Sequence, residues 1–171
     1  MNEILMVSIP ALLVLVTAYV LLDMMFKNEA KRRFFEINKK NISIITPIRL
    51  RAYERLILVL ERTTPNVLIL SVSKPGMSNF DLHAQLLSSV RDEFSHNFSQ
   101  QIYVGDDVWK HFKNAQESLL RLINTCASKC DPNASASQLA ELIIQVYASS
   151  EKTPSEIALE QLKIEVRDFF K

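Results

Sequence analysis

The chain has 171 residues, a formal net charge of +1, 23% charged residues and 48% hydrophobic residues. This length is near that of a single domain, and the charge balance excludes both an intrinsically disordered chain and a strongly basic nucleic-acid-binding protein. Only two glycines occur, which disfavours glycine-rich hairpins and phosphate loops and favours helix throughout. We therefore expect an all-α fold.

The first 26 residues have the composition of a membrane anchor. From Ile4 to Leu22 the sequence carries no charge, and apolar residues continue to Phe26 after the single Asp23. At about 1.5 Å per residue this run is long enough to cross a hydrocarbon layer of roughly 30 Å. A cleaved signal peptide is the alternative, but the positive start and the small-residue cleavage site are missing. We predict a transmembrane helix at residues 1–26.

A cluster of basic residues follows this predicted span. The positive-inside rule then places the N-terminus outside and the later residues in the cytoplasm, at the inner membrane. With no helix breaker before residue 41, the helix is expected to continue as a basic juxtamembrane stalk over residues 27–45. The residues predicted to lie at the membrane and lipid interface are Asp23, Lys27, Lys31, Arg32, Arg33, Lys39 and Lys40.

Residues 46–171 are predicted to form a compact cytoplasmic bundle of about five helices. Apolar residues recur at helical spacing in each segment, most regularly from Val108 to Cys126. Side chains suited to helix capping precede these segments. The predicted helix starts are Thr46 with Pro47, Ser78 with Asp81, Asp106, and Thr153 with Glu156.

Two short segments of this domain stay ambiguous. Residues 66–72 are apolar at almost every position, and a buried strand and a short buried helix look alike at this length. Residues 101–105 look extended. The sequence therefore leaves room for a short extended segment at either place.

Few residues suggest a catalytic or metal-binding site. Glu93 and His96 form a Glu-x-x-His pair, which carboxylate-bridged di-metal bundles use in two copies with two further carboxylates. Only one copy is present, so such a site would need a homodimer. Cys126 and Cys130 continue an apolar stripe, where free cysteine packs as a small apolar residue. We predict no catalytic residue, no cofactor and no metal.

Three segments resemble an uncharacterised family of gram-negative bacterial membrane proteins. They are LRAYERLILVLERTTP (Leu50 to Pro65), RDEFSHNFSQQIYVGDDVW (Arg91 to Trp109) and TPSEIALEQLKIEVRDFF (Thr153 to Phe170). The resemblance implies an N-terminal span followed by a cytoplasmic helical domain. It implies no mechanism.

The leading hypothesis is a non-enzymatic accessory or scaffold subunit of an inner-membrane complex. Its partners would be other membrane-protein subunits, the lipid bilayer or another copy of itself, and no nucleic acid is expected. One alternative is a metal-dependent enzyme that uses Glu93 and His96 in a dimer. The other is a lipid- or ribosome-tethering module that uses basic residues of the stalk, namely Arg32, Arg33, Lys39 and Lys40.

Overall fold

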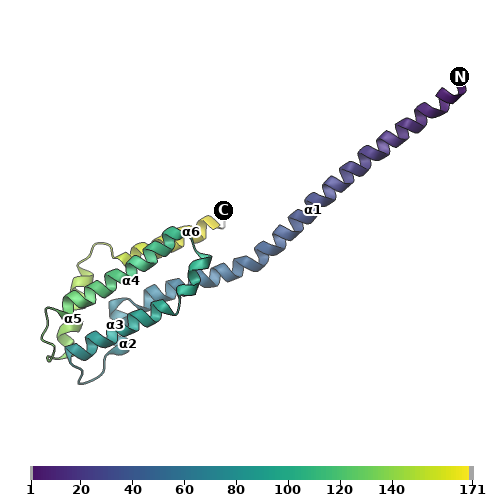
Figure 1. Cartoon of the computed structure of the whole chain (residues 1–171). Helices are drawn as coiled ribbons and strands as arrows, with labels where there is room; N and C mark the ends of the chain where they lie inside the picture. The colour runs from purple at the N-terminus through teal and green to yellow at the C-terminus, as the bar shows by residue number, and fades with distance from the viewer. Residues whose placement is uncertain (1, 170–171) are drawn as a thin grey trace. The chain divides into compact units, whose positions relative to one another are not determined.

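In the computed structural model the chain is all-α, as predicted (Figure 1). The structure describes the backbone of residues 2–169 and the side chains of residues 12–169. This part of the chain forms six α-helices and one short 3₁₀ helix. They are α1 (Asn2–Arg62), α2 (Pro65–Val72), α3 (Asn79–Ser95), η1 (Phe98–Tyr103), α4 (Asp106–Ala127), α5 (Ala136–Ala148) and α6 (Pro154–Phe169).

The chain divides into two compact units, Met1–Pro47 and Ile48–Lys171. The division falls inside α1, at a proline that lacks the N–H of one helical hydrogen bond. The prediction that Thr46 and Pro47 begin a separate helix is therefore wrong. A single proline can be accommodated within a helix, at the cost of one hydrogen bond and a kink, when the residues on both sides are helical.

The predicted transmembrane helix at residues 1–26 is corrected by the structure. No helix within the described residues is both long and apolar enough to cross a membrane. The uncharged run with described side chains reaches from Leu12 to Leu22, which spans about 16 Å or roughly half of a hydrocarbon layer. Residues 1–11 of the predicted span lie outside the part whose side chains are described.

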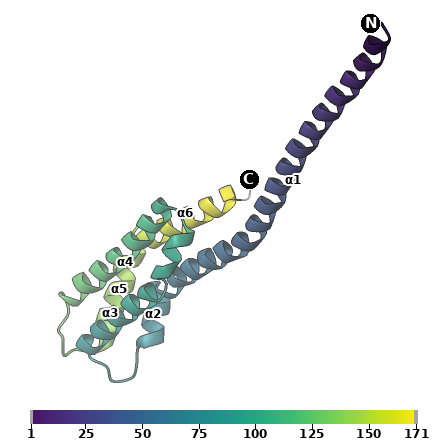
Figure 2. The ribbon, with the colours of Figure 1, turned by 45° about the vertical axis from the view of Figure 1, so that its right-hand side comes forward.

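Unit 2, Ile48–Lys171, is a helical bundle with one continuous core. Figure 2 shows α3 beside α4, and the core also takes in the end of α1 together with α2, α5 and α6. The rings of Phe94 and Phe112 meet at a centroid distance of 4.7 Å, and Trp109 stacks on Phe112 at 5.3 Å. The apolar stripes of α3 and α4 therefore face each other, which is what their helical periodicity predicts.

Residues 66–72 belong to a helix and not to a strand, because they form most of α2. Leu68 and Ile69 are buried, whereas Leu70 is 81% exposed. Residues 101–103 end the 3₁₀ helix η1, and only Val104 and Gly105 have extended backbone. Of the two alternatives left open for 66–72, the structure therefore shows the helix, and the extended backbone expected at 101–105 is present only at Val104 and Gly105.

The two predicted capping boxes are present. At the start of α3, Ser78 Oγ accepts from Asp81 N, and the Asp81 carboxylate accepts from Ser78 N. Thr153 and Glu156 make the equivalent pair of bonds at the start of α6. The predicted start of α4 at Asp106 is confirmed, but its predicted role as the cap is wrong, because Gly105 occupies the N-cap and Asp106 is the first helical residue.

Candidate interaction surface

The part of α1 in unit 1 exposes large apolar side chains along its whole described length. From Leu12 to Phe26 they point to every side of the helix, and Leu15, Tyr19 and Phe26 are 66%, 71% and 72% exposed. A helix that is apolar all round is normally buried in the core of a large protein or in a membrane, and no helix among the described residues can cross a membrane. This segment therefore has the surface of a helix that packs against a partner.

The next segment, residues 27–46, is amphipathic. At 100° per residue its large apolar side chains occupy about half of the helix circumference. All of them are at least half exposed, and they are Phe34, Phe35, Ile37, Ile42, Ile44 and Ile45. Burying a side chain of this size is worth about 1.5–3 kcal/mol. We call residues 27–46 the amphipathic segment. Its exposed apolar face is a candidate binding surface.

The charged residues of the amphipathic segment are mostly basic. Six basic and two acidic residues lie between Lys27 and Thr46, which gives a net charge of +4. Both acids are bonded within the helix, Glu29 to Arg33 at 3.1 Å and Glu36 to Arg32 at 3.0 Å. The bond to Glu36 raises the pKa of Arg32. The acids are therefore engaged locally, and the segment presents an excess of positive charge.

The amphipathic segment contains all the residues predicted to lie at a membrane and lipid interface except Asp23. Asp23 and Lys27 form an ion pair with an N–O distance of 2.6 Å, as their spacing of four predicts. Within the described side chains, no ion pair involves Lys31, Lys39 or Lys40. Sequence reasoning identified the basic residues but overlooked the apolar face between them. The signal was the spacing of Phe34, Ile37 and Ile44.

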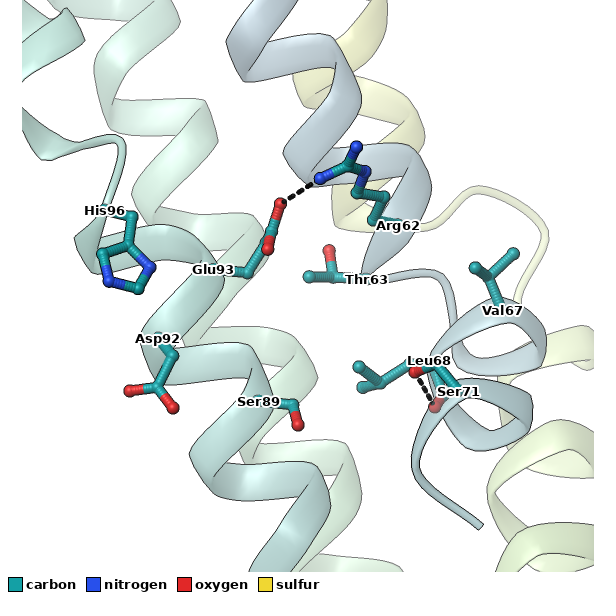
Figure 3. Close-up of a pocket in the computed structure, with 9 residues that line it drawn as sticks. All are labelled: Arg62, Thr63, Val67, Leu68, Ser71, Ser89, Asp92, Glu93 and His96. Carbon is teal, nitrogen blue, oxygen red and sulfur yellow. Dashed lines mark hydrogen bonds and ion pairs between the residues drawn. The ribbon is translucent and has the colours of Figure 1, made fainter.

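A shallow pocket of about 380 Å³ in unit 2 contains the metal candidates (Figure 3). Figure 3 shows the Glu93 carboxylate pointing toward Arg62, with which it pairs at 3.5 Å, while the His96 ring lies apart from it. No group of three or more His, Cys, Asp or Glu side chains able to hold a metal occurs among residues 12–169. A metal site shared by two copies was only an alternative to the prediction of no metal, and the structure of a single chain does not test it.

A partly buried polar cluster that the sequence did not reveal joins distant parts of unit 2. Tyr53 on α1 donates a hydrogen bond of 2.6 Å to Glu165 on α6, and Gly105 N donates to the same carboxylate at 2.9 Å. Arg49 donates to the carbonyl of Tyr103 at 3.0 Å. Burial, followed by the bond to Glu165, raises the pKa of Tyr53 to about 12. The cluster holds the bundle together, and every polar group in it has a structural partner.

The two cysteines are buried and form no disulfide. Cys126 lies in the core on α4, and burial raises the pKa of its thiol. A raised pKa lowers the thiolate fraction, and the thiolate is the reactive form. The thiol therefore acts as a small apolar group in the core.

Comparison with known proteins gives a family but no mechanism. A family model described as a family of unknown function, DUF7935, matches residues 1–169. The chain belongs to this family. No curated protein and no solved structure matches it. The expectation of an uncharacterised family is thus confirmed, and membership in DUF7935 carries no activity over to this chain.

Proposed function

We propose that this DUF7935 protein is a non-enzymatic accessory or scaffold subunit that assembles with partner proteins through the unit 1 part of α1. One observation carries the proposal: apolar side chains stand exposed along this helix from Leu12 to Ile45. Exposure of apolar surface to water is unfavourable, and a contiguous exposed apolar surface marks an interaction site. Its burial requires a second molecule or another segment.

Unit 2 supplies the folded body of this subunit. Its core is closed, and no buried side-chain nitrogen or oxygen among the described residues lacks a hydrogen-bond partner. A rigid domain of this kind suits a second contact, made by its outer helix faces. The proposed assembly belongs to a gram-negative bacterium on the strength of the sequence resemblance alone. Its location at the inner membrane, with unit 2 in the cytoplasm, stays a prediction that cell fractionation tests.

Site-specific photocrosslinking in cells tests the proposal. A benzophenone side chain would replace Phe34 or Ile37 on the apolar face, and Ser43 on the opposite face as the matched control. We expect covalent adducts with a defined polypeptide from the first two positions and none from Ser43. Adducts that form equally from all three positions, or a chain that is monomeric and adduct-free at native abundance, would refute the scaffold role.

A further inference from the structure

One stripe of the amphipathic segment repeats at alternating intervals of four and three residues. It consists of Ala30, Phe34, Ile37, Asn41 and Ile44, and we call it the seam. This spacing is that of the a and d positions of a coiled coil, with Ala30, Ile37 and Ile44 at d and Phe34 and Asn41 at a. Phe34 and Ile37 are 68% and 58% exposed. The seam thus has the spacing of a coiled-coil surface over two heptads.

The positions that flank the seam are basic. Arg33 and Lys40 occupy g positions and Lys31 an e position, whereas Glu29 and Glu36 lie on the outer c positions. In an antiparallel pair of two copies along the seam, Arg33 would face Lys40, and in a parallel pair Arg33 and Lys40 would face Asn38 and Ile45, so neither arrangement supplies a carboxylate. Like charges at such positions disfavour pairing and help to select the partner. The charge pattern therefore favours a partner with acidic flanks over a second copy.

Two amides distinguish a helix partner from a lipid surface. Asn38 and Asn41 lie near the middle of the apolar face. In the apolar region of a bilayer these amides would lose their hydrogen bonds to water without replacement, which is costly. In a coiled coil an Asn at an a position bonds to a polar group opposite and fixes the register of the two helices. The seam is therefore better suited to protein than to lipid.

We propose that the seam binds an acidic helix of another protein. That helix has apolar a and d positions, one polar residue opposite Asn41, and Asp or Glu at its e and g positions. This inference rests on the proposed function, because it assigns a partner chemistry to the same surface. Carboxylates on the partner would pair with Lys31, Arg33 and Lys40.

Two synthetic helical peptides test the charge requirement. Both carry the same apolar a and d residues and one Asn, and they differ only in having Glu or Lys at every e and g position. The full-length chain is titrated with each labelled peptide, and binding is measured by fluorescence anisotropy. We expect the Glu peptide to bind at least tenfold more tightly, by a margin that shrinks as salt rises. Equal affinity, or tighter binding of the Lys peptide, would overturn the inference.

Adjacent lysines provide a matched pair of variants. Lys40 flanks the seam, whereas Lys39 occupies the opposite f position, and both side chains are exposed. We expect Lys40→Glu to weaken binding of the Glu peptide about fivefold and Lys39→Glu to leave it unchanged. Both lysines flank the full apolar face at similar angles, so docking on a lipid surface would make the two variants equally defective.

Two further results would overturn the inference in favour of another occupant. Equal losses for both variants on vesicles of phosphatidylserine and phosphatidylcholine, without peptide binding, would assign the face to lipid. A stable dimer in sedimentation that neither peptide disturbs would assign it to a second copy. Photocrosslinks from Phe34 to a protein without an acidic amphipathic helix would refute this inference alone and leave the scaffold role standing.

Discussion

The two parts of α1 differ in the exposure of their apolar side chains, although both carry apolar residues at helical spacing. In unit 1, Phe34 is 68% exposed, whereas in unit 2 Tyr53 is 2% exposed and Leu56 is fully buried. Unit 2 buries its stripe because α2 to α6 supply surfaces that cover it. The comparison teaches that helical periodicity shows which face of a helix is to be covered, but not whether the same chain covers it.

The largest loss of stability is expected from truncating an aromatic ring in the core of unit 2. Phe112 is fully buried between Phe94 and Trp109. We expect Phe112→Ala to lower the free energy of unfolding of unit 2 by about 3–5 kcal/mol, because it leaves a cavity. Urea unfolding of the full chain, followed by circular dichroism, measures the loss. A change below about 1 kcal/mol would contradict the core that is described.

A smaller effect is expected at the polar cluster. Tyr53→Phe removes the hydroxyl that donates to Glu165, and a hydrogen bond to a charged group is worth about 1.5–3 kcal/mol. Tyr147→Phe is the control, because that hydroxyl donates at 3.3 Å to the neutral Thr153 hydroxyl and should matter less. Urea unfolding at neutral pH compares the two variants. A greater loss for Tyr147→Phe would contradict the assignment.

Tyr53 should also make the free energy of unfolding depend on pH in the alkaline range. The pKa of Tyr53 is about 12 in the folded chain, above its ordinary value of 10.0. Between these values the folded state holds more protons than the unfolded state, so stability falls as pH rises. We expect this part of the loss above about pH 10 to be absent from Tyr53→Phe. Unfolding curves recorded from pH 9 upward for both proteins check it.

A smaller loss of stability than at Tyr53 is expected from removing the cap at the start of α6. Thr153→Ala removes the hydroxyl that accepts from Glu156 N, and loss of such a cap costs about 1 kcal/mol in the free energy of unfolding, measured by urea unfolding.

Hydrogen bonds from Thr153 lower the pKa of Glu156 below 4.5. The carboxylate therefore stabilises the fold above that pH, and the contribution is lost as pH falls through the lower folded value. Glu156→Gln should flatten this acid dependence in thermal melts between pH 3 and 6.

The smallest effect is expected in unit 1. Ile37→Ala removes an apolar side chain that is 58% exposed, so the stability of the isolated chain should change by less than about 0.5 kcal/mol. The same substitution should reduce photocrosslinking from Phe34, because the partner loses part of the surface it covers. A large loss of stability without a partner would mean that the chain itself covers this face.

The sequence determined much of the local structure. The lack of glycine predicted helix throughout, Ser78 with Asp81 and Thr153 with Glu156 marked two helix starts, and the stripe from Val108 to Cys126 marked a buried helix face. These features depend on residues a few positions apart, so they can be found without tertiary structure. The sequence also indicated that the chain belongs to an uncharacterised family, whereas the transmembrane helix predicted from hydropathy is wrong.

Only the tertiary structure decided the features that depend on distant residues. It showed that residues 66–72 form a helix, that α1 continues through Pro47, and that Tyr53, Gly105 and Glu165 meet in one cluster. The bonds from Tyr53 and Gly105 to Glu165 join residues 112 and 60 positions apart. No local pattern encodes such a meeting, because it depends on how the whole bundle packs. For the same reason, only the structure showed which apolar side chains unit 2 buries in its core.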